Sequence, residues 1–132
     1  MRIILLFTLV SLLLSFERGE IVSYEFMESI TQLEAQEEID NELGDLSIQA
    51  EYNISLYSIL YETLDGYGNP TIASGVIAFP ENINKAFGMI SWQHGTQVKR
   101  NSVSSINGFD LLSIVLSSSG YIFVASDYLG LG

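Results

Sequence analysis

The sequence contains no cysteine, one histidine and only five basic residues, and each shortage excludes a class of site. Without cysteine the chain forms neither a disulfide nor a thiolate metal site. The single histidine, His94, cannot build a multi-histidine centre, and the acidic residues lack an Asp-x-Asp-x-Asp calcium loop, so we expect no metal. Sixteen acidic residues bring the net charge to −11, which opposes contact with nucleic-acid phosphates, so we expect no nucleic-acid partner.

Apolar residues are abundant, at 48% of the chain against 16% charged residues, which is typical of a packed globular core. One apolar run, residues 3–16, follows Arg2 and ends at Glu17. It is shorter than the roughly 20 residues of a spanning helix, so we predict a signal peptide over residues 1–19. An uncleaved anchor is the alternative. The prediction places the protein outside the cytoplasm, secreted or periplasmic, with membrane contact only through this segment.

Acidic side chains cluster between residues 26 and 43. Within that stretch Ile30, Leu33, Ile39 and Leu43 recur at roughly helical spacing, and Gly44 follows where a helix would end. The pattern predicts a solvated amphipathic helix that packs on the rest of the chain. We therefore assign residues 20–50 to an acidic helical segment.

The remainder of the chain reads as an antiparallel hairpin followed by a βαβ unit. Residues 52–64 and 71–79 are rich in β-formers and flank a dense turn signal at residues 65–70. A short strand over residues 89–93, mostly apolar and so expected to be buried on both faces, precedes an apolar helix over residues 108–119 and a strand over residues 121–126. Numbered in chain order from the hairpin, these four strands are predicted to lie in the order 1-2-4-3.

Two loops give this α/β pattern a named resemblance. The strand over residues 89–93 runs into Gln-His-Gly-Thr at residues 93–96, and the last strand runs into Asp-Tyr-Leu-Gly-Leu-Gly at residues 127–132. Together, in this order, they resemble the amino-terminal third of the α/β-hydrolase superfamily, and are most similar to its secreted lipase and esterase-like branch. The resemblance implies that residues 51–132 are the amino-terminal part of a truncated α/β-hydrolase domain with a partial sheet.

The resemblance also implies a role for the turn after the short strand. In such folds this loop supplies one backbone N–H to the oxyanion hole, and the matching donor is the amide of Thr96, with Gly95 permitting close approach. His94, Asp127 and Gly130 are expected to be structural: His94 satisfies backbone groups at the strand end, Asp127 caps its own turn, and Gly130 lets its loop pass close to the oxyanion turn.

No serine in the chain has glycine at both −2 and +2, so the Gly-x-Ser-x-Gly nucleophile elbow is absent, and no triad residue is assigned. The leading hypothesis is an amino-terminal fragment of a secreted serine ester hydrolase, which needs no cofactor and whose intact form acts on a small-molecule or lipid ester. This chain alone would not be catalytic. The alternative is a small secreted binding or surface protein without catalytic activity.

Overall fold

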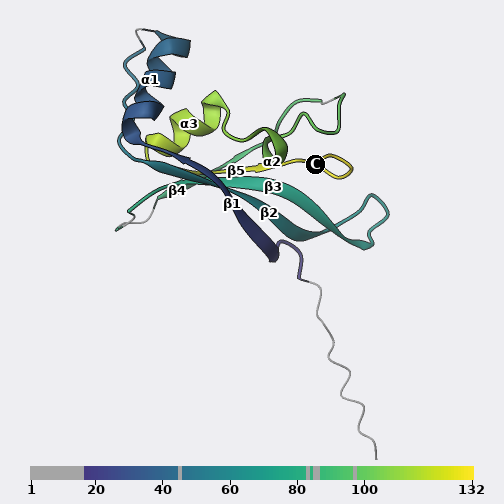
Figure 1. The fold of residues 1–132 in the computed structure, drawn as a ribbon. Helices are drawn as coiled ribbons and strands as arrows, with labels where there is room; N and C mark the ends of the chain where they lie inside the picture. Colours follow the sequence, from purple (N-terminus) through teal and green to yellow (C-terminus); the bar gives the residue numbers. More distant parts are fainter. Residues whose placement is uncertain (1–16, 45, 83, 85–86, 97) are drawn as a thin grey trace, which may run out of the picture.

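The computed structural model describes residues 17–44, 46–82, 84, 87–96 and 98–132. In chain order its elements are β1 (Ile21–Ile30), α1 (Gln32–Leu43), β2 (Ile54–Leu64), β3 (Pro70–Pro80), β4 (Gly88–Trp92), α2 (Ser104–Asn107), α3 (Leu111–Ser118) and β5 (Tyr121–Ser126). The strands form one sheet in the order β1-β2-β3-β5-β4, and the helices lie on one side of it (Figure 1). The apolar run of the predicted signal, residues 3–16, lies outside the described residues.

The predicted hairpin is β2 and β3, paired antiparallel from Ile54 opposite Pro80 to Leu64 opposite Pro70. The side chain of Asp65 shapes the turn because its carboxylate accepts hydrogen bonds from the backbone N–H groups of Tyr67, at 2.8 Å, and Asn69, at 2.9 Å. These contacts, chiefly those with Asn69, hold the pKa of the Asp65 carboxyl below its usual value. The turn chemistry thus sets the register of the longest strand pair.

The βαβ unit is also present, with β4 and β5 parallel and β5 antiparallel to β3. The order β2-β3-β5-β4 confirms the predicted order of those four strands. The predicted helix over residues 108–119 is α3, and a separate short helix, α2, precedes it at residues 104–107, where no helix was predicted. Gly108, at φ +83°, ends α2, and α3 begins after Asp110, whose carboxylate accepts a hydrogen bond from the Ser113 N–H at 2.7 Å.

The acidic segment departs from the prediction in its first half. Residues 26–30 belong to β1, an edge strand paired antiparallel with β2, and only Gln32–Leu43 is helical. Thr31 separates the two elements. It is extended, its hydroxyl accepts from the Glu34 N–H, and the Glu34 carboxylate accepts from the Thr31 N–H at 2.7 Å. The assignment of residues 20–50 as helical is therefore wrong for β1, because this capping box starts the helix later.

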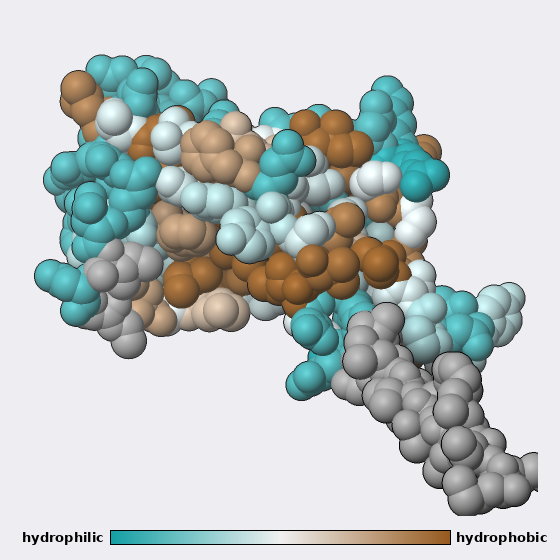
Figure 2. Space-filling view, turned by 60° about the horizontal axis from the view of Figure 1, so that its bottom comes forward, coloured by the Kyte–Doolittle hydropathy of each residue, from teal (hydrophilic) through white to brown (hydrophobic). Residues whose placement is uncertain are grey.

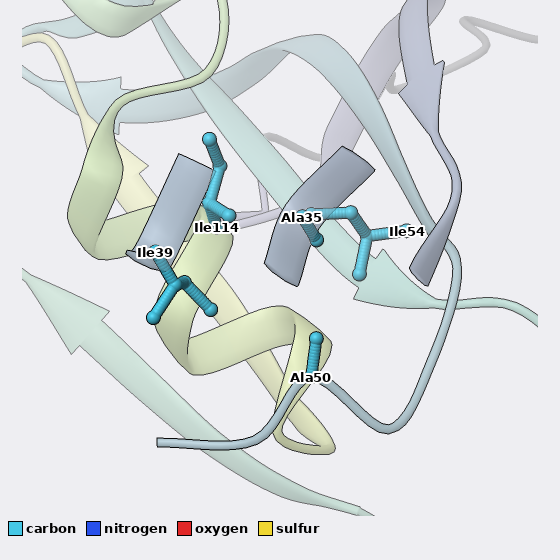
Figure 3. Close-up of a cluster of buried hydrophobic side chains, with 5 residues drawn as sticks. All are labelled: Ala35, Ile39, Ala50, Ile54 and Ile114. Atoms are coloured by element: carbon cyan, nitrogen blue, oxygen red, sulfur yellow. The ribbon is translucent and has the colours of Figure 1, made fainter. Parts of the chain in front are cut away.

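The helices cover one face of the sheet, which we call the covered face. Its centre is a cluster of side chains from β2, β3 and β5, with Leu112 and Leu116 of α3 packed against it: Leu56, Val76, Ala78, Phe123 and Ala125. Figure 3 shows the second cluster, where α1 and α3 meet the end of β2 and where Ala35, Ile39 and Ile54 are fully buried. Burial of this apolar surface fixes the helices on the sheet.

The opposite face, which we call the open face, has no helix on it among the described residues (Figure 1). Apolar side chains nevertheless gather there in a band along the sheet (Figure 2). A hollow of about 330 Å³ on this face is lined by Ile21, Ile77, Met89 and Val124, among others. The sheet therefore presents an apolar surface on both sides but packs only one of them.

Strand β4 was predicted to be buried on both faces, and that prediction is wrong. It lies at the sheet edge, where Met89 is 67% and Trp92 41% exposed. Only β5 pairs with it among the described strands, so its outer edge is unpaired there and its side chains stay partly exposed. No helix in the described part of the chain is long and apolar enough to cross a bilayer.

Candidate functional site

Because β4 and β5 are parallel neighbours, their carboxyl ends open at the same edge of the sheet. The two loops that leave these ends are in contact. The Tyr128 hydroxyl donates a hydrogen bond to the His94 carbonyl at 3.0 Å, and the two rings lie with their centroids 4.1 Å apart. The structure thus brings the His94–Gly95 turn and the Asp127–Tyr128 loop together, as the two sequence motifs implied.

The His94 side chain contacts the backbone of its own turn. Its Nδ1 lies 2.7 Å from the Gly95 carbonyl oxygen, so Nδ1 carries the hydrogen and donates it. The other ring nitrogen, Nε2, is buried with no hydrogen-bond partner among the described residues. The ring is therefore oriented by one bond to the backbone and by the Tyr128 ring, at the cost of an unpaired nitrogen.

Thr96 is exposed, and within the described part of the chain its amide donates no hydrogen bond. Beside it, a pocket of about 320 Å³ is lined by Trp92, His94 and Gly95 on one side and by residues of α2 and its flanks on the other. Thr96 itself is not part of that lining. The geometry leaves the Thr96 N–H available to a group outside the described chain.

Gly130 was expected to let its loop pass close to the oxyanion turn, and that expectation is not met. A Cβ at Gly95 or at Gly130 would meet no described atom within 4 Å, so neither residue lets two described segments approach closely. Gly130 is instead required by its left-handed backbone, at φ +85°. Gly132 is the residue in close contact: a Cβ there would strike the Ser74 hydroxyl and lie 2.9 Å from an Asp127 carboxylate oxygen.

Asp127 is 1% exposed and does not cap its own turn, contrary to the expectation. Its carboxylate accepts hydrogen bonds from the Ser74 hydroxyl of β3 at 2.7 Å and from the Ser105 N–H of α2 at 3.4 Å. Its own N–H donates to the Ser74 carbonyl at 3.0 Å. None of the described basic residues pairs with it, so these hydrogen bonds compensate its burial. Asp127 thereby ties β5 to β3 and α2.

The negative charge of Asp127 also affects a residue of the open face, Tyr61. Burial raises the pKa of the Tyr61 hydroxyl, a hydrogen bond with the Ser126 side chain lowers it, and the negative charge of Asp127 raises it further. Ser74, Ser105 and Tyr61 were not among the predicted residues. The one available signal was Ser74 itself, a hydroxyl inside the apolar run of β3.

No protein-family model and no curated protein sequence matches the chain. Solved structures do. A proposed hydrolase from Legionella pneumophila is 35% identical, with a TM-score of 0.69 over 85% of this chain and 31% of that one. The rice cell wall degrading esterase LipA from Xanthomonas oryzae is 30% identical, with a TM-score of 0.73 over 87% of this chain and 30% of that one. In a ligand-bound form of LipA the values are 31% and 0.75.

The chain carries part of an α/β-hydrolase fold. It spans about a third of the length of the solved structures it matches. This α/β-hydrolase part comprises the mixed sheet and the helices of its covered face. In the described residues, His, Asp and Glu side chains form no group of three or more that could hold a metal ion.

Proposed function

We propose that this chain is the amino-terminal part of a secreted serine ester hydrolase, and that it supplies one oxyanion-hole donor, the amide of Thr96. The observation that carries the proposal is the position of the Gly95–Thr96 turn. The turn follows β4 at the sheet edge where β5 also ends, it borders a pocket, and the Thr96 N–H has no partner in the described chain. Such an amide can stabilise the negative oxygen of a tetrahedral intermediate.

The nucleophile of the proposed reaction is a serine encoded beyond Gly132. That serine attacks the ester carbonyl, the alcohol leaves, and water releases the acid from the acyl-enzyme. The substrate class is a small-molecule or lipid ester, in keeping with the esterase activity named for LipA. Secretion rests on the apolar run at residues 3–16 and accords with the cell wall substrate of LipA. This chain contributes the oxyanion donor and no triad residue.

The first test is to read the gene past the codon for Gly132. The proposal requires a Gly-x-Ser-x-Gly motif at a strand-to-helix turn within the next hundred or so residues, since such a domain commonly exceeds 200 residues. If that stretch has no such motif, the hydrolase proposal is wrong.

The second test removes the proposed donor in the complete polypeptide. Thr96→Pro deletes the N–H, and we expect kcat for a nitrophenyl ester to fall by about 10²–10³-fold, the usual cost of one oxyanion donor. Thr96→Ala keeps the amide and removes the same side chain, so its kcat should match the parent enzyme. Thermal unfolding of both variants reports whether the fold is retained. Equal activity of Thr96→Pro and Thr96→Ala would contradict the assigned role.

A further inference from the structure

Tyr128 has a backbone conformation that tyrosine seldom adopts. Its φ is +63°, in the left-handed region, where a side chain raises the energy of the backbone. Glycines occupy that region elsewhere in the same loop, at Gly130 and Gly132. Strained residues of this kind persist where their surroundings hold them, and they cluster at functional sites. A tyrosine at this position therefore indicates a role for its side chain.

The Tyr128 side chain holds the His94 turn by two contacts. Its hydroxyl donates to the His94 carbonyl at 3.0 Å, and its ring lies against the His94 ring, 4.1 Å away and tilted by 37°. The residue before it is fixed as well, because the Asp127 carboxylate is bound by the Ser74 hydroxyl. Tyr128 is therefore anchored on the sheet while its side chain reaches the neighbouring loop.

The His94 ring passes this constraint to the next peptide. Nδ1 donates to the Gly95 carbonyl at 2.7 Å. The Gly95 carbonyl and the Thr96 N–H belong to the same peptide unit, which is planar, so fixing the oxygen fixes the direction of the N–H. The ring keeps this bond although Nε2 stays buried and unpaired among the described residues. The Tyr128 ring, packed on the imidazole, opposes a rotation that would exchange the two nitrogens.

We infer that Tyr128 is a positioning residue that aims the Thr96 amide, acting through His94. The inference rests on the proposed oxyanion role of Thr96. The hydroxyl of Tyr128 holds the peptide before Gly95, and its ring holds the imidazole that orients the peptide after it. The left-handed backbone of Tyr128 is the conformation that brings both groups onto the turn.

Kinetics of the complete polypeptide test the inference. Tyr128→Phe removes the hydroxyl and keeps the ring, and Tyr128→Leu removes both. We expect kcat to fall about tenfold in Tyr128→Phe, the value of one hydrogen bond, and further in Tyr128→Leu, with KM within about twofold. The matched control is Tyr121→Phe, at the opposite end of β5, which should change neither constant. If kcat of both Tyr128 variants stays within about twofold of the parent, the inference is wrong.

A double-mutant cycle separates positioning from a general loss of structure. If Tyr128 acts through the Thr96 amide, Tyr128→Phe costs nothing further once Thr96→Pro has removed that amide. A purely structural effect of Tyr128 would lower kcat by the same factor in both backgrounds, and additive losses would overturn the inference.

Nuclear magnetic resonance gives a readout that does not need activity. Signals of the His94 ring, assigned by their loss in His94→Gln, and of the Thr96 amide should shift in Tyr128→Leu and not in Tyr121→Phe. Unchanged signals in Tyr128→Leu would overturn the inference even in an active enzyme. Shifted signals in a protein that hydrolyses no ester would support the positioning of the amide and refute the proposed function, so the two failures are distinguishable.

Discussion

The two faces of the sheet are both apolar, yet they differ in what covers them. On the covered face, Leu56 and Phe123 are fully buried under α3. On the open face, Ile21 is 48% and Met89 67% exposed, although both line the same apolar hollow. Apolar sequence alone therefore does not determine burial in this fold, because burial also requires an element that packs against the strand.

The exposed apolar side chains of the open face indicate where further polypeptide would pack. Soluble proteins seldom expose a large contiguous apolar surface. The chain spans about a third of the solved structures it matches. We expect the open face and the β4 edge to be covered in the complete enzyme proposed above. The covered face is then the part of the core that this chain completes by itself.

The largest expected difference between the faces is in stability. Leu56→Ala removes a fully buried side chain from the covered face, and we expect the free energy of unfolding to fall by about 3 kcal/mol. Met89→Ala on the open face removes a side chain that is already 67% exposed, and should change it by no more than about 0.5 kcal/mol. Urea denaturation of both variants measures the contrast.

Met89→Ala in a longer polypeptide tests whether the open face is covered there. A small loss in this chain and a large loss in a longer polypeptide would show that the added residues pack on the open face. Similar losses for Leu56→Ala and Met89→Ala in this chain would contradict the distinction between the faces.

A second expected difference is electrostatic. Tyr61 belongs to the open face, and its pKa is raised first by burial and also by the negative charge of Asp127. Asp127→Asn removes that charge, so the pKa of Tyr61 should fall toward its ordinary value of 10.0. Alkaline absorbance titration measures it, with Tyr61→Phe identifying the contribution of this group. Asp40→Asn, on α1 and above the covered face, is the control and should leave the titration unchanged.

The sign of the linked stability follows from the raised pKa. Folded protein holds the Tyr61 proton more tightly than unfolded protein does, so this stabilisation is complete below pH 10.0 and is lost as the pH rises through the folded pKa. Cover on the open face in a longer polypeptide would bury Tyr61 further and raise its pKa more. A Tyr61 titration that Asp127→Asn does not alter would rule out the electrostatic contact through the sheet.

The sequence predicted those parts of the fold that depend on neighbours in the chain. The turn after β2 was evident because Asp65, Gly66, Gly68 and Pro70 form a local signal, and the order of four strands followed from the βαβ pattern. Strand β1 was missed because apolar residues of β1 and α1 happen to continue one helical spacing across Thr31. The capping box at Thr31 was readable and would have corrected the start of the helix.

The position of the candidate site could be predicted from the sequence, but the contacts between its residues could not. Parallel strands put His94 and Asp127 at one edge, which the motifs implied. The bond from Ser74 to Asp127 joins residues 53 positions apart, and no local pattern specifies it. Nor does any pattern predict a left-handed backbone at Tyr128, because local preference disfavours it and only the contact with His94 explains it.

The smallest expected effect concerns α1, one of the helices that cover the sheet. The Glu34 carboxylate accepts hydrogen bonds from the Thr31 N–H and hydroxyl, and these contacts, the backbone one first, lower the pKa of Glu34 below 4.5. The resulting stabilisation is present above that pH and is lost as the pH falls through the folded pKa. Glu34→Gln cannot titrate, so the parent should be the more stable protein at about pH 7, and its advantage should be smaller at about pH 3.

Thermal unfolding at both pH values measures this difference, and the control is Glu37→Gln, which lies on the same helix and makes no cap contact. Ala35 and Ile39 of α1 pack in the buried cluster of the covered face, so weakening the start of α1 should weaken that face as well. The open face has no helix whose cap could titrate in the described chain. An acid-dependent difference that is equally large for Glu37→Gln would assign the effect to overall charge and not to the cap.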